Sequence, residues 1–212
     1  MKNLFGKLLI VLALAVGFVS CMKDDSNDDW LKQLEEQERM IDSVLSADKI
    51  KIKEYIEANL PDAIEDTVTF DFEYLKKPNV KRGIWYKVHQ LATDDSYEYQ
   101  IVGNQYKFPR VKLNYTAKLL DGTLVETAEN ENFDFDAQSS VINNTWFISF
   151  FPYSIRLNSN DIIAGGLTED GLKTGSIITV VTPSQYAYGT SAKTNIPANS
   201  PLVYEFEVLS IQ

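Results

Sequence analysis

Short segments of alternating apolar and polar residues recur along the last 130 or so residues of the chain, and this recurrence constrains the fold most. The segments cover residues 83–91, 111–119, 154–157, 176–182 and 202–211. Their length and their period of two residues predict strands, and only the stretch near residues 169–173 predicts a helix. We therefore expect an α+β fold in which an antiparallel sheet wraps around one short helix. A weaker alternation over residues 66–80 predicts one more strand, ending in a turn.

A helical pattern precedes these strands. Apolar residues at Trp30, Leu34 and Ile41 are separated by charged ones, which predicts an amphipathic helix over about residues 28–45. Asp48 is then expected to act as the N-cap of a second helix that Pro61 terminates. Two interpretations stay open for this segment. It is either a spacer that packs on the main domain or an arm through which two copies form a homodimer.

The first twenty residues have the layout of a secretory signal. Lys2 and Lys7 precede an apolar run over residues 8–19, which is shorter than the roughly 20 residues of a membrane-spanning helix. The run ends at Cys21, the only cysteine of the chain. Its setting, Phe-Val-Ser-Cys, resembles the lipobox of bacterial lipoproteins and implies cleavage before Cys21 and lipidation of its thiol. The alternative is an ordinary signal end.

An acidic stretch follows the cysteine. Residues 22–29 contain almost nothing to bury and predict a solvated tether. Its start, Met-Lys-Asp-Asp, is similar to the signal that sends lipoproteins of the Bacteroidetes group to the outer face of the outer membrane, so we expect a membrane-anchored envelope protein. The formal net charge of −10 makes nucleic acid an unsuitable partner. The predicted divisions are residues 1–20, 21–29, 30–80 and 81–212.

Three segments within residues 81–212 carry a family resemblance. They cover residues 83–88, 111–123 and 182–209, and the third contains the runs Tyr-Ala-Tyr-Gly and Ile-Pro-Ala-Asn. In this order and spacing they resemble the FKBP-type peptidyl-prolyl cis-trans isomerases. The resemblance implies an FKBP-like fold, proline-containing polypeptides as substrates, and no cofactor or metal. Isomerisation needs neither, since an apolar cleft can favour the twisted amide.

The resemblance also implies the residues of the cleft. Aromatic walls are expected from Tyr115, Tyr188 and Tyr204, and a fourth tyrosine, aliphatic residues and one carboxylate complete the site. The full set is Tyr115, Val125, Glu126, Tyr153, Ile162, Ile163, Tyr188, Ile196 and Tyr204. Tyr188 is expected to offer its hydroxyl to a substrate carbonyl. The alternative for each aromatic is an ordinary core position in a sheet.

Two departures from the family pattern bear on activity. Where the family commonly has a tryptophan at the pocket floor, this chain reads Gly165-Gly166. An aromatic-rich stretch over residues 129–153 could supply the floor through Trp146, or could form an extra hairpin at the edge of the sheet. Two functions therefore remain open: a prolyl isomerase that assists folding of exported proteins, or a binding module that kept the fold without the chemistry.

Other chemistries have weaker support. His89 is the only histidine and lies within a predicted strand without a serine motif nearby, so a hydrolytic triad is not indicated. Glu131, Asp134 and Asp136 are acidic, but their spacing matches no calcium loop.

Overall fold

The computed structural model describes residues 26–92, 97–103, 105–137 and 140–212. The predicted signal segment, Cys21 and the start of the tether lie outside these residues. Within the described part, no helix combines the length and the apolar character that a membrane span requires.

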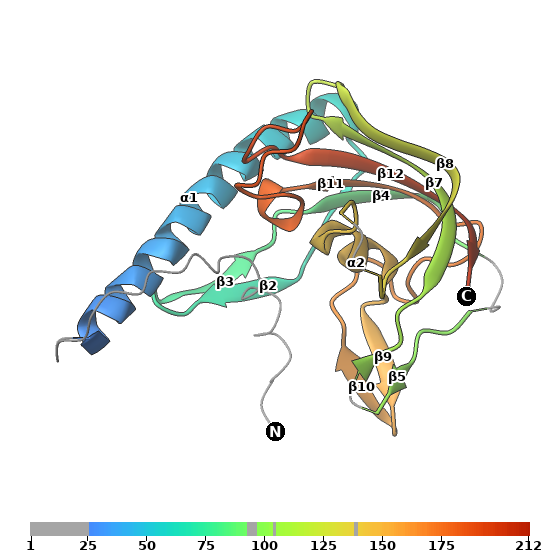
Figure 1. The fold of residues 1–212 in the computed structure, drawn as a ribbon, viewed down its shortest axis with the longest axis horizontal. Helices are drawn as coiled ribbons and strands as arrows, with labels where there is room; N and C mark the ends of the chain where they lie inside the picture. Colours follow the sequence, from blue (N-terminus) through green and yellow to red (C-terminus); the bar gives the residue numbers. More distant parts are fainter. Residues whose placement is uncertain (1–25, 93–96, 104, 138–139) are drawn as a thin grey trace.

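A six-stranded antiparallel sheet forms the centre of the molecule (Figure 1). Its strands stand in the order β1-β4-β11-β12-β7-β8, and their bounds are Ile64–Glu65, Trp85–Gln90, Ile177–Thr182, Leu202–Ile211, Arg110–Leu119 and Leu124–Asp134. Three two-stranded sheets accompany it. They pair β2 (Thr69–Phe72) with β3 (Lys77–Lys81), β5 (Ile101–Val102) with β6 (Gln105–Tyr106), and β9 (Ser154–Leu157) with β10 (Asn160–Ile163).

Two α-helices pack on opposite faces of the large sheet. On β12, Tyr204 belongs to the core that α2 (Asn144–Phe150) fills, whereas its neighbour Val203 contacts the residues of α1 (Ser26–Asn59). Successive strand residues point to opposite faces, so both faces of this sheet are covered. Figure 1 shows α1 running along one side of the sheet and α2 enclosed on the other. The predicted α+β class, a sheet wrapped around a short helix with a helical segment before it, is confirmed.

The N-terminal helical segment differs from expectation because α1 is one continuous helix of 34 residues. Asp48 lies in its interior and does not cap a second helix. No Gly or Pro interrupts the sequence around this position, and the Asp48 carboxylate is bound by Ser184. The C-terminal part of α1 packs Ile52 and Ile56 against Val181 and Val203, so this part of the segment belongs to the main domain.

The short helix also lies elsewhere than predicted. Residues 169–173 are irregular, and Gly171 among them has a positive φ of 73° that a regular helix excludes. The helix enclosed by the sheet is α2, inside the aromatic stretch 129–153, so this stretch is not simply an extra hairpin. The predicted strand over 66–80 is the hairpin β2–β3, whose turn includes Lys76 at a positive φ of 53°.

Candidate functional site

Three tyrosines and one glutamate come together on the α2 side of the large sheet. Tyr115 on β7 and Tyr204 on β12 are almost fully buried, and Tyr188 follows the 3-10 turn η1 (Ser184–Tyr186). The Tyr188 hydroxyl donates a hydrogen bond of 2.6 Å to Oε1 of Glu126 on β8. The structure thus gathers four of the predicted cleft residues from four separate segments.

The surroundings keep these groups in defined protonation states. Burial, the Tyr204 hydroxyl and the Glu126 carboxylate together raise the pKa of Tyr188 far above its usual value. Burial likewise raises the pKa of Tyr115 and of Tyr204. The hydroxyls are therefore neutral hydrogen-bond donors throughout the physiological pH range.

The surroundings of Glu126 shift the pKa of its carboxyl in opposite directions. Burial raises the pKa of its carboxyl, while the hydrogen bond from Tyr188 and the charge of Lys193 lower it, and the rise prevails. The Lys193 ammonium lies 5.1 Å from the centre of the Tyr188 ring, within the range of a cation–π contact. The second carboxylate oxygen, Oε2, is buried without a hydrogen-bond partner among the described residues.

A cavity of about 180 Å³ opens beside this cluster. Its lining comes from the start of β8, from the chain before α2 and from the loop after η1, and comprises Val125, Glu126, Ser140, Val141, Lys193, Thr194, Asn195 and Ile196. Val125, Glu126 and Ile196 were predicted as cleft residues, and the structure places all three on this wall. Ile196 is held there by paired backbone hydrogen bonds with Lys193.

Trp146 lies beneath the cluster. Its ring centre is 4.9 Å from that of Tyr115 and 5.0 Å from that of Phe206, in edge-to-face arrangements, and its side chain is fully buried. The indole nitrogen has no hydrogen-bond partner among the described residues. An aromatic ring therefore supports the tyrosines from the side of α2.

Asn143 fixes this helix relative to the cluster. Its side-chain oxygen caps α2 by accepting from the Thr145 backbone N–H, and its amide nitrogen donates to the Tyr204 hydroxyl at 2.9 Å. Sequence reasoning missed Asn143 because it placed no helix after it. The signal was present, since Asn is among the best N-cap residues and an apolar run follows.

The expected floor position is occupied by glycine for a packing reason. A Cβ on Gly166 would lie 1.7 Å from the Phe151 carbonyl oxygen, far inside van der Waals contact. Gly165 has a positive φ of 78°, and its carbonyl accepts from Arg82 at 2.8 Å. No side chain, and least of all an indole, fits at Gly166.

The remaining predicted residues lie on a different element. Tyr153 precedes the hairpin β9–β10, and Ile162 and Ile163 are in β10. Tyr153 and Ile163 are 44% and 52% exposed. This hairpin is a sheet separate from the one that carries the tyrosine cluster.

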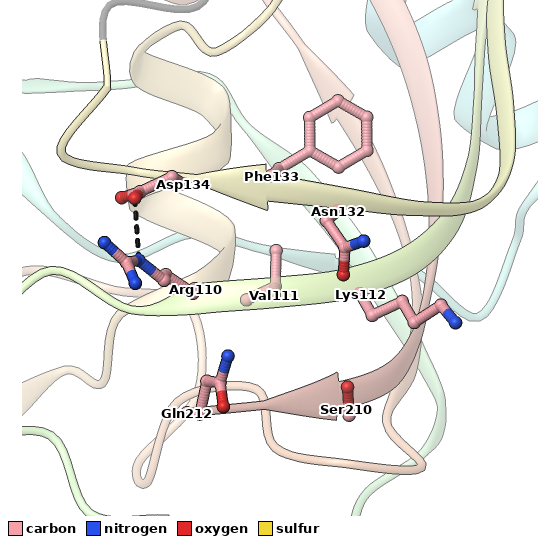
Figure 2. Close-up of a pocket in the computed structure, with 8 residues that line it drawn as sticks. All are labelled: Arg110, Val111, Lys112, Asn132, Phe133, Asp134, Ser210 and Gln212. Atoms are coloured by element: carbon pink, nitrogen blue, oxygen red, sulfur yellow. Dashed lines mark hydrogen bonds and ion pairs between the residues drawn. The ribbon is translucent and has the colours of Figure 1, made fainter.

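A larger hollow, of about 330 Å³, lies at the opposite ends of the same strands (Figure 2). In Figure 2, Arg110 and Asp134 face each other across β7 and β8, joined by an ion pair of 2.8 Å. Its other lining residues are Val111, Lys112, Asn132, Phe133, Ser210 and Gln212. Within this lining, Arg110 and Asp134 neutralise each other's charge.

Metal chemistry finds no support in the described part of the chain, where no group of three or more His, Cys, Asp or Glu side chains could hold an ion. Asp134 of the acidic stretch instead accepts hydrogen bonds from Arg110 and from the Asp136 backbone N–H. These bonds lower the pKa of its carboxyl.

The sheet, the enclosed helix and the cavity beside the tyrosine cluster define an FKBP-like α+β domain. The family model described as FKBP-type peptidyl-prolyl cis-trans isomerase matches residues 105–209. The chain therefore belongs, through this domain, to the FKBP-type peptidyl-prolyl cis-trans isomerase family, as the resemblance predicted.

Individual relatives are more distant. FK506-binding protein 4 of Chaetomium thermophilum is 30% identical over 141 residues, which cover 65% of this chain and 24% of the relative. The chain thus spans about a quarter of that relative. Among solved structures, a peptidyl-prolyl cis-trans isomerase of Pseudomonas syringae is 20% identical with a TM-score of 0.45, covering 81% of this chain and 95% of its own. FkpA of Escherichia coli is 21% identical with a TM-score of 0.46, covering 91% and 75%.

Proposed function

We propose that this protein is a peptidyl-prolyl cis-trans isomerase whose cleft is the cavity beside Tyr115, Glu126, Tyr188 and Tyr204. The observation that carries the proposal is the hydrogen bond that Tyr188 donates to Glu126, a residue of the cavity wall, in a tyrosine cluster supported by a buried tryptophan and in a domain of this family. Tyr153, Ile162 and Ile163 are not part of the cleft that we propose.

Prolyl isomerisation breaks no covalent bond, so the protein only has to lower the barrier to rotation about the Xaa-Pro amide. Rotation about an Xaa-Pro bond meets a barrier of about 20 kcal/mol because the amide loses its conjugation as it twists. Val125, Val141 and Ile196 offer the apolar part of the cavity lining to the proline ring, and excluding water there favours the less polar twisted amide. On peptide entry, Tyr188 exchanges its bond to Glu126 for one to a substrate carbonyl. Neutral tyrosine hydroxyls suit this donation, and no acid–base step is required.

A second function, a binding module without turnover, is favoured by one observation. Trp146 is fully buried beneath Tyr115, so the indole does not itself line the cavity. Such a module binds proline-containing segments but gives no rate enhancement.

Exchange NMR on a short Xaa-Pro peptide distinguishes the two functions. The protein from residue 22 onward should accelerate cis-to-trans exchange, and Tyr188→Ala should lose most of the acceleration. Tyr74→Ala, which alters a tyrosine on the far hairpin β2–β3, serves as the matched control. Peptide binding by folded protein without acceleration, over a panel of residues before proline, would establish the binding module instead.

We further propose that the protein is lipidated at Cys21 and acts on exported polypeptides at the outer membrane. The support is the signal-like segment followed by the only cysteine and an acidic tether. Fractionation of cells that express the full chain tests this. The Cys21→Ser protein should be absent from the membrane fraction. Equal amounts of the parent and the variant in that fraction would contradict the proposal.

The long helix α1 leaves room for a homodimer. Leu31 and Met40 of its N-terminal half are 46% and 56% exposed. Sedimentation of the soluble protein decides whether two copies associate, and Leu31→Glu together with Met40→Glu should dissociate such a dimer. A monomer at all concentrations would leave α1 solely as a part of the isomerase domain.

A further inference from the structure

A buried carboxylate on α1 is bonded to the segment that carries Tyr188. Asp48 is 1% exposed, and its Oδ2 accepts two hydrogen bonds from Ser184: 2.9 Å from the backbone N–H and 2.6 Å from the hydroxyl. The two residues are 136 positions apart in the sequence. A buried carboxylate is costly unless it is hydrogen-bonded, and here one oxygen has two donors.

Ser184 is the first residue of the turn that presents Tyr188. Its carbonyl accepts from the backbone N–H groups of Ala187 at 3.0 Å and Gly189 at 2.8 Å, one on each side of Tyr188. Pro183, which precedes the turn, provides no side-chain cap for η1. The carboxylate of Asp48 on α1 accepts the hydrogen bond from the Ser184 backbone N–H in place of a local cap. Asp48 therefore caps η1, whereas the sequence had predicted that it caps a second helix.

The turn is also held from the other face of the sheet. The Thr145 hydroxyl of α2 donates to the Tyr186 carbonyl at 3.0 Å. The chain around Tyr188 is thus bonded to α1 through Ser184 and to α2 through Tyr186. Hydrogen bonds fix direction as well as distance, which apolar packing alone does not.

We propose that Asp48 is a positioning residue for the cleft: through Ser184 it sets the conformation of the 184–189 turn and hence the place of the Tyr188 hydroxyl beside Glu126. The inference rests on the proposed function for its effect on rate, but its structural claim stands apart from activity. The N-terminal helix then contributes to the site although none of its residues lines the cavity.

Two readouts test the inference in the protein from residue 22 onward. The first is the NMR signal of the Tyr188 hydroxyl proton, which its 2.6 Å bond to Glu126 should slow in exchange and shift downfield, and which is assigned by its absence from Tyr188→Phe. The second is kcat/KM on an Xaa-Pro peptide. Asp48→Ala should shift or lose the signal and lower kcat/KM on the order of tenfold. Asp48→Asn keeps an oxygen acceptor and should restore both.

Glu38 offers a matched control on the same helix. Its carboxylate accepts from the backbone N–H groups of Glu73, Tyr74 and Leu75, so it binds α1 to the β2–β3 turn and not to η1. Glu38→Ala should lower thermal stability and leave the Tyr188 signal and kcat/KM as they are.

The outcomes are distinct. A folded Asp48→Ala protein with the parental signal and rate would overturn the inference, as would an equal loss in Glu38→Ala. If Asp48→Ala fails to fold, Ser184→Ala is the second variant, because it removes only the hydroxyl donor to Asp48. It should shift the Tyr188 hydroxyl signal in the same direction, and an unshifted signal would overturn the inference. If the parent accelerates no exchange, the proposed function fails while the hydroxyl signal still tests the positioning.

Discussion

Gly166 and Trp146 show how packing by neighbouring residues determines which residue type a position can hold. Where the family commonly has a tryptophan floor, this chain has Gly165-Gly166, and the Phe151 carbonyl occupies the space that any Cβ on Gly166 would need. The aromatic support comes instead from Trp146 on α2, against Tyr115. The loss of one tryptophan from the pattern is therefore not the loss of an aromatic ring under the tyrosines.

Gly166→Ala should destabilise the protein by more than about 3 kcal/mol, because backbone must move to admit the methyl group. Gly165→Ala is the matched control, since a Cβ there meets only the end of the Arg82 side chain at 3.8 Å and the cost comes from its positive φ, about 1–2 kcal/mol. Urea unfolding of both variants measures the difference. Equal losses of unfolding free energy in the two variants would show that the backbone around Gly166 and Phe151 can move apart at little cost.

The Glu126 carboxyl predicts a pH dependence of stability. Its folded-state pKa is raised, so the ionised carboxylate is penalised in the folded protein above the unfolded pKa, and the penalty disappears as pH falls below it. Glu126→Gln keeps the acceptor for Tyr188 and should melt a few degrees higher than the parent at pH 7. The gap should close by about pH 4. A gap that widens on acidification in thermal melts would contradict the assigned direction.

Among the elements, four of the six strands of the large sheet (β4, β7, β11 and β12) could be predicted from the sequence, whereas β1, β8 and the enclosed helix were missed. β7 alternates buried and partly buried residues from Val111 to Lys118, and β12 alternates buried and exposed residues from Tyr204 to Val208, which is the period of two that a strand imposes. α2 has seven residues, none of them exposed, and its buried Thr145 and Ser149 interrupt the apolar pattern, so no exposed polar face marks a helical period. In the site, Tyr115, Tyr188 and Tyr204 followed from motif resemblance, whereas Asn143 depended on knowing where α2 begins.

Trp146→Ala tests the contribution of α2. Removing a fully buried indole should cost about 3–5 kcal/mol and should lower peptide exchange activity, since Tyr115 loses its support. Trp30 on α1 is 55% exposed, and Trp30→Ala should cost less than about 1 kcal/mol with activity retained. Chemical denaturation followed by circular dichroism gives both values. Full activity in a folded Trp146→Ala protein would remove the indole from our account of the cleft.

At the scale of the whole molecule, the N-terminal segment and the family domain share one structure. Ile52 and Ile56 pack on the sheet, Asp48 binds Ser184, and Arg82 joins the buried Asp66 to Gly165. The sequence suggested a boundary near residue 80 because the family resemblance begins there. Contacts between distant segments have no local signature, so that boundary could not be checked from the sequence.

Substitutions of two isoleucines on α1, one buried and one exposed, test whether α1 unfolds together with the sheet. Ile52 is fully buried against the sheet, and Ile52→Ala should cost about 2–5 kcal/mol in the single unfolding transition of the domain. Ile50, two residues earlier, is 63% exposed, so Ile50→Ala should change stability by less than about 0.5 kcal/mol. An early, separate transition that alone responds to Ile52→Ala would mean that α1 unfolds independently of the sheet.

The position of β12 carries a consequence for biosynthesis. This strand is the last element of the chain and stands between β11 and β7, so it alone joins the β1-β4-β11 half of the sheet to the β7-β8 half. Until β12 has been synthesised, the two halves have no common neighbour in the sheet. The large sheet is therefore completed only when β12 joins it, and until then the unfinished chain depends on whatever shields unfinished proteins from one another.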